Sequence, residues 1–81
     1  MLIVRGLVVK AVAGRDKSKF FVVIDLNKEY VNICDGKRRP VSKTKRKNIK
    51  HLSFTKVVLD EDSLKTNKKI RSILRSFSEK N

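Results

Sequence analysis

The amino-acid sequence predicts a mainly β protein, a small antiparallel barrel of about five strands followed by a C-terminal amphipathic helix. Three observations lead to this fold class. Short apolar runs rich in Val, Ile and Phe recur between residues 7 and 59, and turns with little sequence in them join the runs. After the acidic residues 60–62, the apolar spacing changes from two residues to that of a helix. At 81 residues the chain is long enough for one domain with a small core.

The first two expected strands differ in how much surface they bury. From Leu7 to Ala13, alternate apolar residues share one face, while Lys10 points the other way. Gly14 to Ser18 then supplies a turn. Phe20 to Ile24 is continuously apolar and rich in β-branched and aromatic residues, so we expect this strand to be buried on much of both faces.

The third and fourth strands are expected to form a tight hairpin. A strand over Glu29 to Cys34 is followed by Asp35-Gly36, a dipeptide typical of two-residue hairpins because both positions can take positive φ. The chain would then turn straight back and place Lys37 to Arg39 in a fourth strand beside the third. Pro40 cannot donate to a ladder, so this strand is expected to be an edge or to end there.

A basic segment and a fifth strand follow. Ser42 to Lys50 has Ile49 as its single apolar residue, which predicts a basic loop. Leu52 and Phe54 then alternate with polar residues, which predicts a strand that continues toward Leu59.

The apolar residues after position 62 predict the helix and its packing. They form one stripe at helical spacing: Ile70, Ile73, Leu74 and Phe77. Thr66 or Asn67 can accept from the first N–H groups as N-cap. We expect the helix to pack Ile73 and Phe77 against the barrel and to expose its bases. The chain would then consist of a barrel over residues 1–60 and a helical extension over residues 61–81.

Positive charge dominates the composition. The chain has 21 Lys or Arg residues against 8 Asp or Glu, a net charge of +13, so it repels itself and attracts polyanions. The run KRRPVSKTKRKNIKH, from Lys37 to His51, holds eight of these bases and no acid. We expect this run to capture phosphates, because like charges this dense are costly to hold together without a polyanion.

The composition also argues against several classes of protein. Grouped apolar segments argue against full disorder, and no run approaches the ~20 apolar residues that cross a bilayer. The single cysteine, Cys34, allows no internal disulfide and fits a reducing compartment, so we expect a cytoplasmic location. Cys34 and His51, the single histidine, cannot complete a zinc site, and no set of catalytic side chains can be assembled. We therefore expect no enzymatic activity, metal or cofactor.

Part of the chain resembles a known family. The stretch GLVVKAVAGRDKSKFFVVIDLNKEYVNICDG resembles the KOW motif, which is a strand, a loop with glycine and basic residues, and an apolar strand. The run AGRDKSKFFVV followed by KHLSF is similar to bacterial RNA-binding proteins related to the KOW-type large-subunit ribosomal proteins of archaea and eukaryotes. The resemblance covers about Gly6 to Leu59. Two positions depart from the motif: Ser18 stands where glycine is expected, and proline is missing near Thr44.

The resemblance implies an SH3-like barrel that binds structured RNA, commonly ribosomal RNA. It implies that the loop contacting RNA contains Gly14, Arg15, Asp16, Lys17, Ser18 and Lys19. Together with the basic run, this predicts a small non-enzymatic RNA-binding protein whose partner is RNA, ribosomal by resemblance, or a ribosomal subunit, with no membrane and no small-molecule substrate. The residues expected to contact RNA are Arg15, Lys17, Lys19, Lys37, Arg38, Arg39, Lys43, Lys45, Arg46, Lys47 and Lys50.

One aromatic residue is a candidate for base stacking, and two other functions are considered. Tyr30 is the candidate for base stacking because its hydroxyl prefers a wet position, whereas burial suits Phe20 and Phe54 in so small a domain. One alternative is a DNA-associated or transcription-related KOW module, whose phosphate contacts would look the same. Another is a protein adaptor with an acidic partner, whose groove would take the helix stripe.

Overall fold

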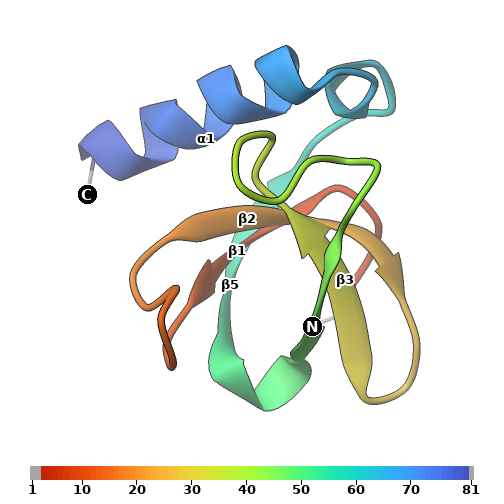
Figure 1. The fold of residues 1–81 in the computed structure, drawn as a ribbon, viewed down its shortest axis with the longest axis vertical. Coiled ribbons are helices and arrows are strands. Elements are labelled where there is room, and N and C mark those ends of the chain that lie inside the picture. The colour runs from red at the N-terminus through yellow and green to blue at the C-terminus, as the bar shows by residue number, and fades with distance from the viewer. Residues whose placement is uncertain (1–2, 81) are drawn as a thin grey trace.

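The structure is a computed structural model that describes residues 3–80. It confirms a mainly β fold in which five antiparallel strands form one sheet, in the order β4-β3-β2-β1-β5, with one C-terminal helix (Figure 1). The elements are β1 (Leu7–Ala11), β2 (Phe20–Leu26), β3 (Tyr30–Cys34), β4 (Lys45–Asn48), the 3-10 helix η1 (Ile49–His51), β5 (Leu52–Val58), the 3-10 helix η2 (Asp62–Leu64) and α1 (Asn67–Lys80). Within residues 3–80 β4 does not pair with β5, so the curled sheet is a barrel that stays open along this side.

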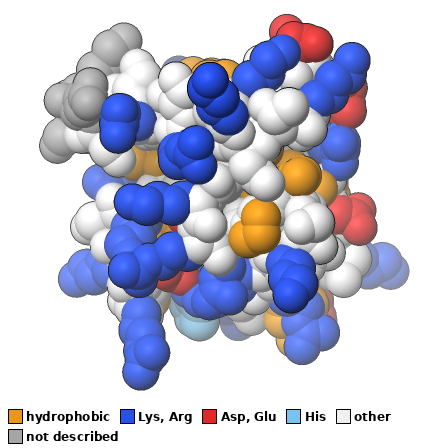
Figure 2. All heavy atoms as spheres, turned by 45° about the horizontal axis from the view of Figure 1, so that its top comes forward, with side chains coloured by type: hydrophobic (Ala, Val, Ile, Leu, Met, Phe, Trp, Pro, Cys, Tyr) orange, Lys and Arg blue, Asp and Glu red, His pale blue; other side chains and the backbone are white. Residues whose placement is uncertain are grey.

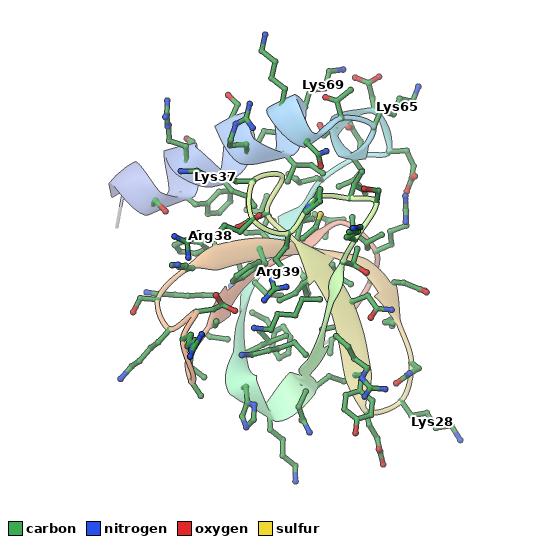
Figure 3. All side chains as sticks on the ribbon, viewed as in Figure 1. Lys28, Lys37, Arg38, Arg39, Lys65 and Lys69 are labelled. Carbon is green, nitrogen blue, oxygen red and sulfur yellow. The ribbon has the colours of Figure 1, made fainter. Side chains whose placement is uncertain are left out.

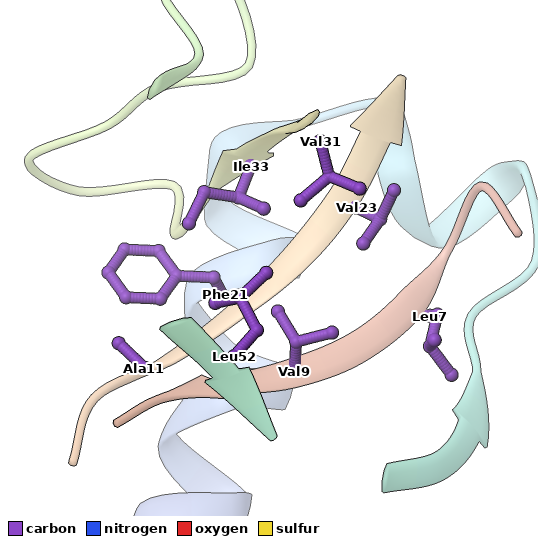
Figure 4. Packing of buried hydrophobic residues seen from close by; sticks show 8 residues of the cluster. All are labelled: Leu7, Val9, Ala11, Phe21, Val23, Val31, Ile33 and Leu52. Carbon is purple, nitrogen blue, oxygen red and sulfur yellow. The ribbon is translucent and has the colours of Figure 1, made fainter. Parts of the chain in front are cut away.

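The concave face of the sheet holds the first core cluster. Its side chains come from alternate positions of four strands, as the two-residue period requires (Figure 4). Its members are Leu7, Val9, Ala11, Phe21, Val23, Val31, Ile33 and Leu52. Each large side chain buried here contributes about 1.5–3 kcal/mol relative to an exposed one. Phe54 packs against the cluster, which confirms the expected inward face of the fifth strand.

The opposite face of the sheet forms a second core cluster with the helix. Val8, Phe20, Val22 and Cys34 meet Leu64, Ile70 and Leu74 there. The Phe20 and Phe77 rings lie 5.6 Å apart. Strand β2 is therefore buried on both faces at its N-terminal half, as its continuous apolar run predicted.

The helix packs with Phe77, as expected, but with Ile70 and Leu74 in place of Ile73. Ile70 and Leu74 are its buried residues, while Ile73 is only half-buried and Phe77 packs at the margin of the cluster. The buried face of the helix is rotated away from Ile73 because Leu64 and the sheet residues of the second cluster contact Ile70 and Leu74. The N-cap prediction is confirmed at Thr66, whose Oγ1 accepts from the Lys69 N–H.

The predicted tight hairpin at Asp35-Gly36 is wrong. Residues Lys37 to Arg39 form no strand, and the segment between β3 and β4 is a loop. Asp35 Oδ1 accepts hydrogen bonds at 2.9 Å from the N–H groups of Lys37 and Arg39. These bonds wrap the chain around one carboxylate, so it does not return directly beside β3. Gly36 has the positive φ expected of it, at +75°.

The predicted basic loop over Ser42 to Lys50 is also wrong, because it contains β4 and most of η1. Strand β4 pairs with β3 from Tyr30↔Asn48 to Ile33↔Lys45. Paired residues share a face, so Lys45 and Lys47 lie on the concave side, and both are partly buried. Long basic side chains with aliphatic stems can occupy such a face, so this strand needs no apolar residue.

Candidate nucleic-acid interface

Two adjoining hollows form a groove lined by bases. One has a volume of about 370 Å³ and the other about 160 Å³, and Lys19, Asp35 and Arg38 line both. We call their joint lining the basic groove. Its bases are Arg15, Lys19, Lys37, Arg38, Arg39, Lys45, Arg71 and Arg75, and its acids are Asp16 and Asp35. They come from the β1–β2 loop, the β3–β4 loop, β4 and α1, so the fold gathers bases that are far apart in sequence.

The figures show how this charge is arranged. Figure 2 shows a face on which Lys and Arg side chains greatly outnumber acids. In Figure 3, Lys37 lies beside α1, and Arg38 and Arg39 lie successively farther from the helix, with Arg39 in front of the sheet. Lys65 and Lys69 lie near the other end of the helix, and Lys28 lies at the opposite end of the molecule.

An ion pair between Asp16 and Lys45 holds the β1–β2 loop. Lys45 Nζ donates to Asp16 Oδ2 at 2.6 Å, and both side chains are mostly buried, with exposed fractions of 28% for Lys45 and 16% for Asp16. This hydrogen bond is the main reason why the pKa of Asp16 is lowered from its usual range. The pair joins the loop to β4 and leaves Arg15 and Lys19 exposed beside it.

Backbone geometry in the same loop bears on Ser18, where the resemblance leads us to expect glycine. Ser18 stands where glycine is expected, and its φ of +73° lies in the left-handed region that glycine favours. The Ser18 N–H donates to the Ala11 carbonyl at 2.7 Å. The loop therefore has the glycine-like conformation at this position even though a serine stands there.

Helix α1 holds the β3–β4 loop in place. A Cβ on Gly36 would collide with the backbone carbonyl of Asn67, so the loop touches the helix backbone at this point. Arg71 Nη1 donates to the Gly36 carbonyl at 3.3 Å. The Val41 N–H donates to Asn67 Oδ1 at 2.8 Å. These contacts place the bases of residues 37–39 next to those of the helix.

The two acids of the groove are engaged by the protein itself. Asp16 pairs with Lys45, and Asp35 accepts from two backbone N–H groups. Among the described side chains, neither Arg38 nor Arg75 forms an ion pair. Apart from Lys45, the bases of the groove form no ion pair among the described side chains, so they can donate to phosphate oxygens without first breaking one.

The apolar floor of the groove offers no surface for base stacking. Phe20 and Leu74 line it and are buried. Phe20 is flanked by the Phe77 ring and by Lys10 Nζ, which lies 5.5 Å from the centre of the Phe20 ring. The exposed hydrogen-bond donors of the groove are cationic, so the groove suits anions such as phosphates better than neutral nucleobases.

Six of the predicted RNA-contacting bases lie in the groove and five lie outside it. Lys17 is exposed in the β1–β2 loop, and Lys43 is exposed in the turn before β4. Lys47 is half-buried, and its Nζ donates to the Ala13 carbonyl at 3.4 Å. Lys50 lines a separate hollow, and Arg46 lies over the Tyr30 ring.

Two bases of the groove, Arg71 and Arg75, were not predicted as contact residues. Their positions off the apolar stripe showed that they avoid the core, but not what lies beside them. The contact between Gly36 and the helix brings the β3–β4 loop next to them. The sequence carries no signal for that contact.

The remaining reactive side chains form no site of their own. Cys34 is buried, and burial raises the pKa of its thiol to about 11. His51 is exposed in η1. Within the described part of the chain, no three His, Cys, Asp or Glu side chains are grouped so that they could hold a metal ion.

Among the described residues, no helix is long and apolar enough to cross a membrane. Comparison with known proteins found no protein-family model that matches this chain and no curated protein with significant sequence similarity.

Proposed function

We propose that this protein is a small cytoplasmic RNA-binding protein without enzymatic activity, and that the basic groove holds the phosphate backbone of structured RNA. The observation that carries the proposal is the convergence of eight bases from four segments on one groove. The two acids among them already have partners within the protein. Because such a lining favours a polyanion over a neutral partner, and the chain carries a net charge of +13, phosphate is the group that fits.

The shape of the groove supports recognition of the backbone. Five of its eight bases are arginines, whose planar donors can bind phosphate through two hydrogen bonds at once. The floor side chains Phe20 and Leu74 are packed into the core. A folded RNA is then read through the spacing of its phosphates, as is usual for A-form helices.

The KOW resemblance of residues 6–59 supports ribosomal RNA as the partner. The loop that the resemblance implicates, from Gly14 to Lys19, supplies two groove bases and the acid that anchors β4. A ribosomal subunit is therefore the particle that we propose this protein binds.

The adaptor alternative loses its docking element. It required a free helix stripe, but Ile70 and Leu74 are buried against the sheet, with exposed fractions of 0% and 5%. A helix in this position cannot insert the same side chains into the groove of another protein.

Two experiments test the proposal. The first is sedimentation of cell lysate through a sucrose gradient at low and moderate salt, and we expect the protein to migrate with a ribosomal subunit and to leave it as salt rises. A protein that stays at the top of the gradient at both salt concentrations would contradict the ribosomal partner.

The second experiment is competition between a folded RNA and a DNA duplex of equal length. We expect RNA to compete better because its 2′-hydroxyls and A-form geometry are absent from DNA. Equal competition would favour the DNA-associated module.

A further inference from the structure

A second exposed surface lies at the other end of β3 from the basic groove. Tyr30 begins β3, whereas Asp35 of the groove follows its last residue. Tyr30 and Asn32 share a face of the sheet with Cys34, because side chains alternate along a strand. The helix cluster buries Cys34, but Tyr30 and Asn32 are only half-buried. This part of the face is therefore open beyond the cover of α1.

Arg46 lies over the Tyr30 ring on this open face. Its Cζ is 4.7 Å from the ring centre, within the range of a cation–π contact. Arg46 is exposed and, among the described side chains, forms no ion pair. The ring thus holds a guanidinium at the surface, and no described carboxylate lies within ion-pair distance of it. An unpaired RNA base can stack on such a group.

Groups that can hydrogen-bond a base edge surround Arg46. The strand register places Asn32 opposite Arg46 on one side and opposite Asp25 on the other. Asn48 is opposite Tyr30 and lines a hollow of about 300 Å³ with Lys28, Glu29 and Lys50. Asn48 Oδ1 already accepts from the Lys50 N–H at 2.9 Å, so its amide offers mainly N–H donors, whereas the Asn32 amide offers donors and an acceptor, and a carboxylate accepts from the amino group of a base.

The acids on this surface distinguish it from the basic groove. Neither Asp25 nor Glu29 forms an ion pair among the described side chains, and Asp25 Oδ1 accepts a hydrogen bond from the Leu26 N–H at 3.0 Å. A phosphate would be repelled by them, whereas a neutral base would not. Lys28 and Lys50 lie close enough to contact the phosphates that flank such a base.

We propose that Tyr30 and Arg46 form a binding site for one unpaired nucleobase, such as a bulged or looped-out base of the RNA. This inference rests on the proposed function, because the groove supplies the phosphate contacts and the Tyr30–Arg46 site adds a preference for RNA with an unpaired base. Tyr30 acts mainly by supporting Arg46, and the guanidinium is the group that contacts the base.

The test compares two hairpin RNAs that differ by one bulged 2-aminopurine. The wild-type protein should bind the bulged RNA at least about fivefold more tightly than the perfect duplex, the lower limit of base stacking effects. Binding should also change the fluorescence of the 2-aminopurine. Arg46→Lys keeps the charge but loses the planar group, so it should bind both RNAs equally. Tyr30→Leu, which removes the supporting ring, should also reduce the preference for the bulged RNA. Urea unfolding of each variant shows whether it is folded.

The outcomes separate this inference from the proposed function. If the wild-type protein binds both RNAs equally, or if Arg46→Lys keeps the full preference for the bulge, the base site is wrong while RNA binding stands. If the wild-type protein binds neither RNA, the proposed function fails as well. A folded Arg46→Lys variant that binds the perfect duplex like the wild type and has lost the preference supports the base site.

Discussion

Lys45 Nζ and Asp16 Oδ2 lie 2.6 Å apart and join the β1–β2 loop to β4. Asp16 comes from the loop that the KOW resemblance implicates, and Lys45 comes from the basic run. It therefore positions the basic groove as well as stabilising the fold.

Replacing Asp16 with Asn should lower the free energy of unfolding. We expect a loss of about 1–2 kcal/mol at pH 7, between the values for exposed and for buried ion pairs, because both side chains are mostly buried. Urea unfolding measures this. Glu29→Gln is the matched control, since it removes one acid that has no ion pair among the described residues. Equal losses in both variants would show that only net charge matters.

The effect of Asp16 should also depend on pH. The pKa of Asp16 is lowered in the folded protein, first by the hydrogen bond from Lys45. A group with a lowered folded-state pKa stabilises the protein above its unfolded pKa, about 3.9 for Asp, and this contribution is lost as the pH falls through the folded-state pKa. The difference between wild type and Asp16→Asn should therefore be complete at pH 7 and shrink below about pH 4. A difference that stays constant in acid would contradict the ion pair.

Two glycine variants test the contact between the β3–β4 loop and α1. Gly36 and Gly14 both have positive φ, at +75° and +79°, so alanine is strained at either position. Of these two positions, Gly36 is the one where a Cβ would collide with backbone, namely that of Asn67. Gly14→Ala should cost about 1 kcal/mol, and Gly36→Ala should cost about 1–3 kcal/mol more because of the overpacking. Thermal or urea unfolding gives both values, and equal losses would contradict the close approach.

Replacing Ser18 with Gly should raise the free energy of unfolding. The left-handed φ of +73° costs an L-residue about 1–2 kcal/mol, and glycine removes that strain while losing about 0.5–1 kcal/mol through greater freedom in the unfolded chain. A net gain of about 0.5–1 kcal/mol follows. Ser18→Ala keeps the Cβ and should show no gain. If the glycine variant is no more stable than the alanine variant, the backbone here is not strained.

The sequence predicted most of the fold because four strands and the helix have recognisable apolar patterns, either periodic or continuous. Phe20 to Ile24 was predicted to be buried on two faces and is, because its neighbours supply a curved sheet on one side and a helix on the other. Strand β4 was missed because it has no apolar residue. This strand forms because it pairs with β3 and because the aliphatic stems of Lys45 and Lys47 cover the concave face. A search for apolar periodicity detects neither feature.

The site could be predicted only in part, for a related reason. The basic run indicated phosphate binding, but the position of each base depends on tertiary contacts. Asp35 was interpreted as a hairpin residue, whereas its carboxylate caps the loop that carries Arg38. Arg71 and Arg75 joined the groove because that loop packs on the helix.

The salt dependence of RNA affinity shows whether the basic groove holds phosphates. The measurement compares the wild type with Arg38→Ala/Arg75→Ala, which removes two groove charges, and with Lys56→Ala/Lys65→Ala, which removes two exposed charges outside the groove. If the groove contacts six to ten phosphates, the wild-type affinity should fall about 10³–10⁵-fold between 50 and 200 mM salt.

The groove variant should bind more weakly at low salt, and its log–log slope should be less steep by about two. The control variant should keep the wild-type slope. A wild-type affinity that hardly changes with salt, or equal effects of the two double variants, would contradict the account.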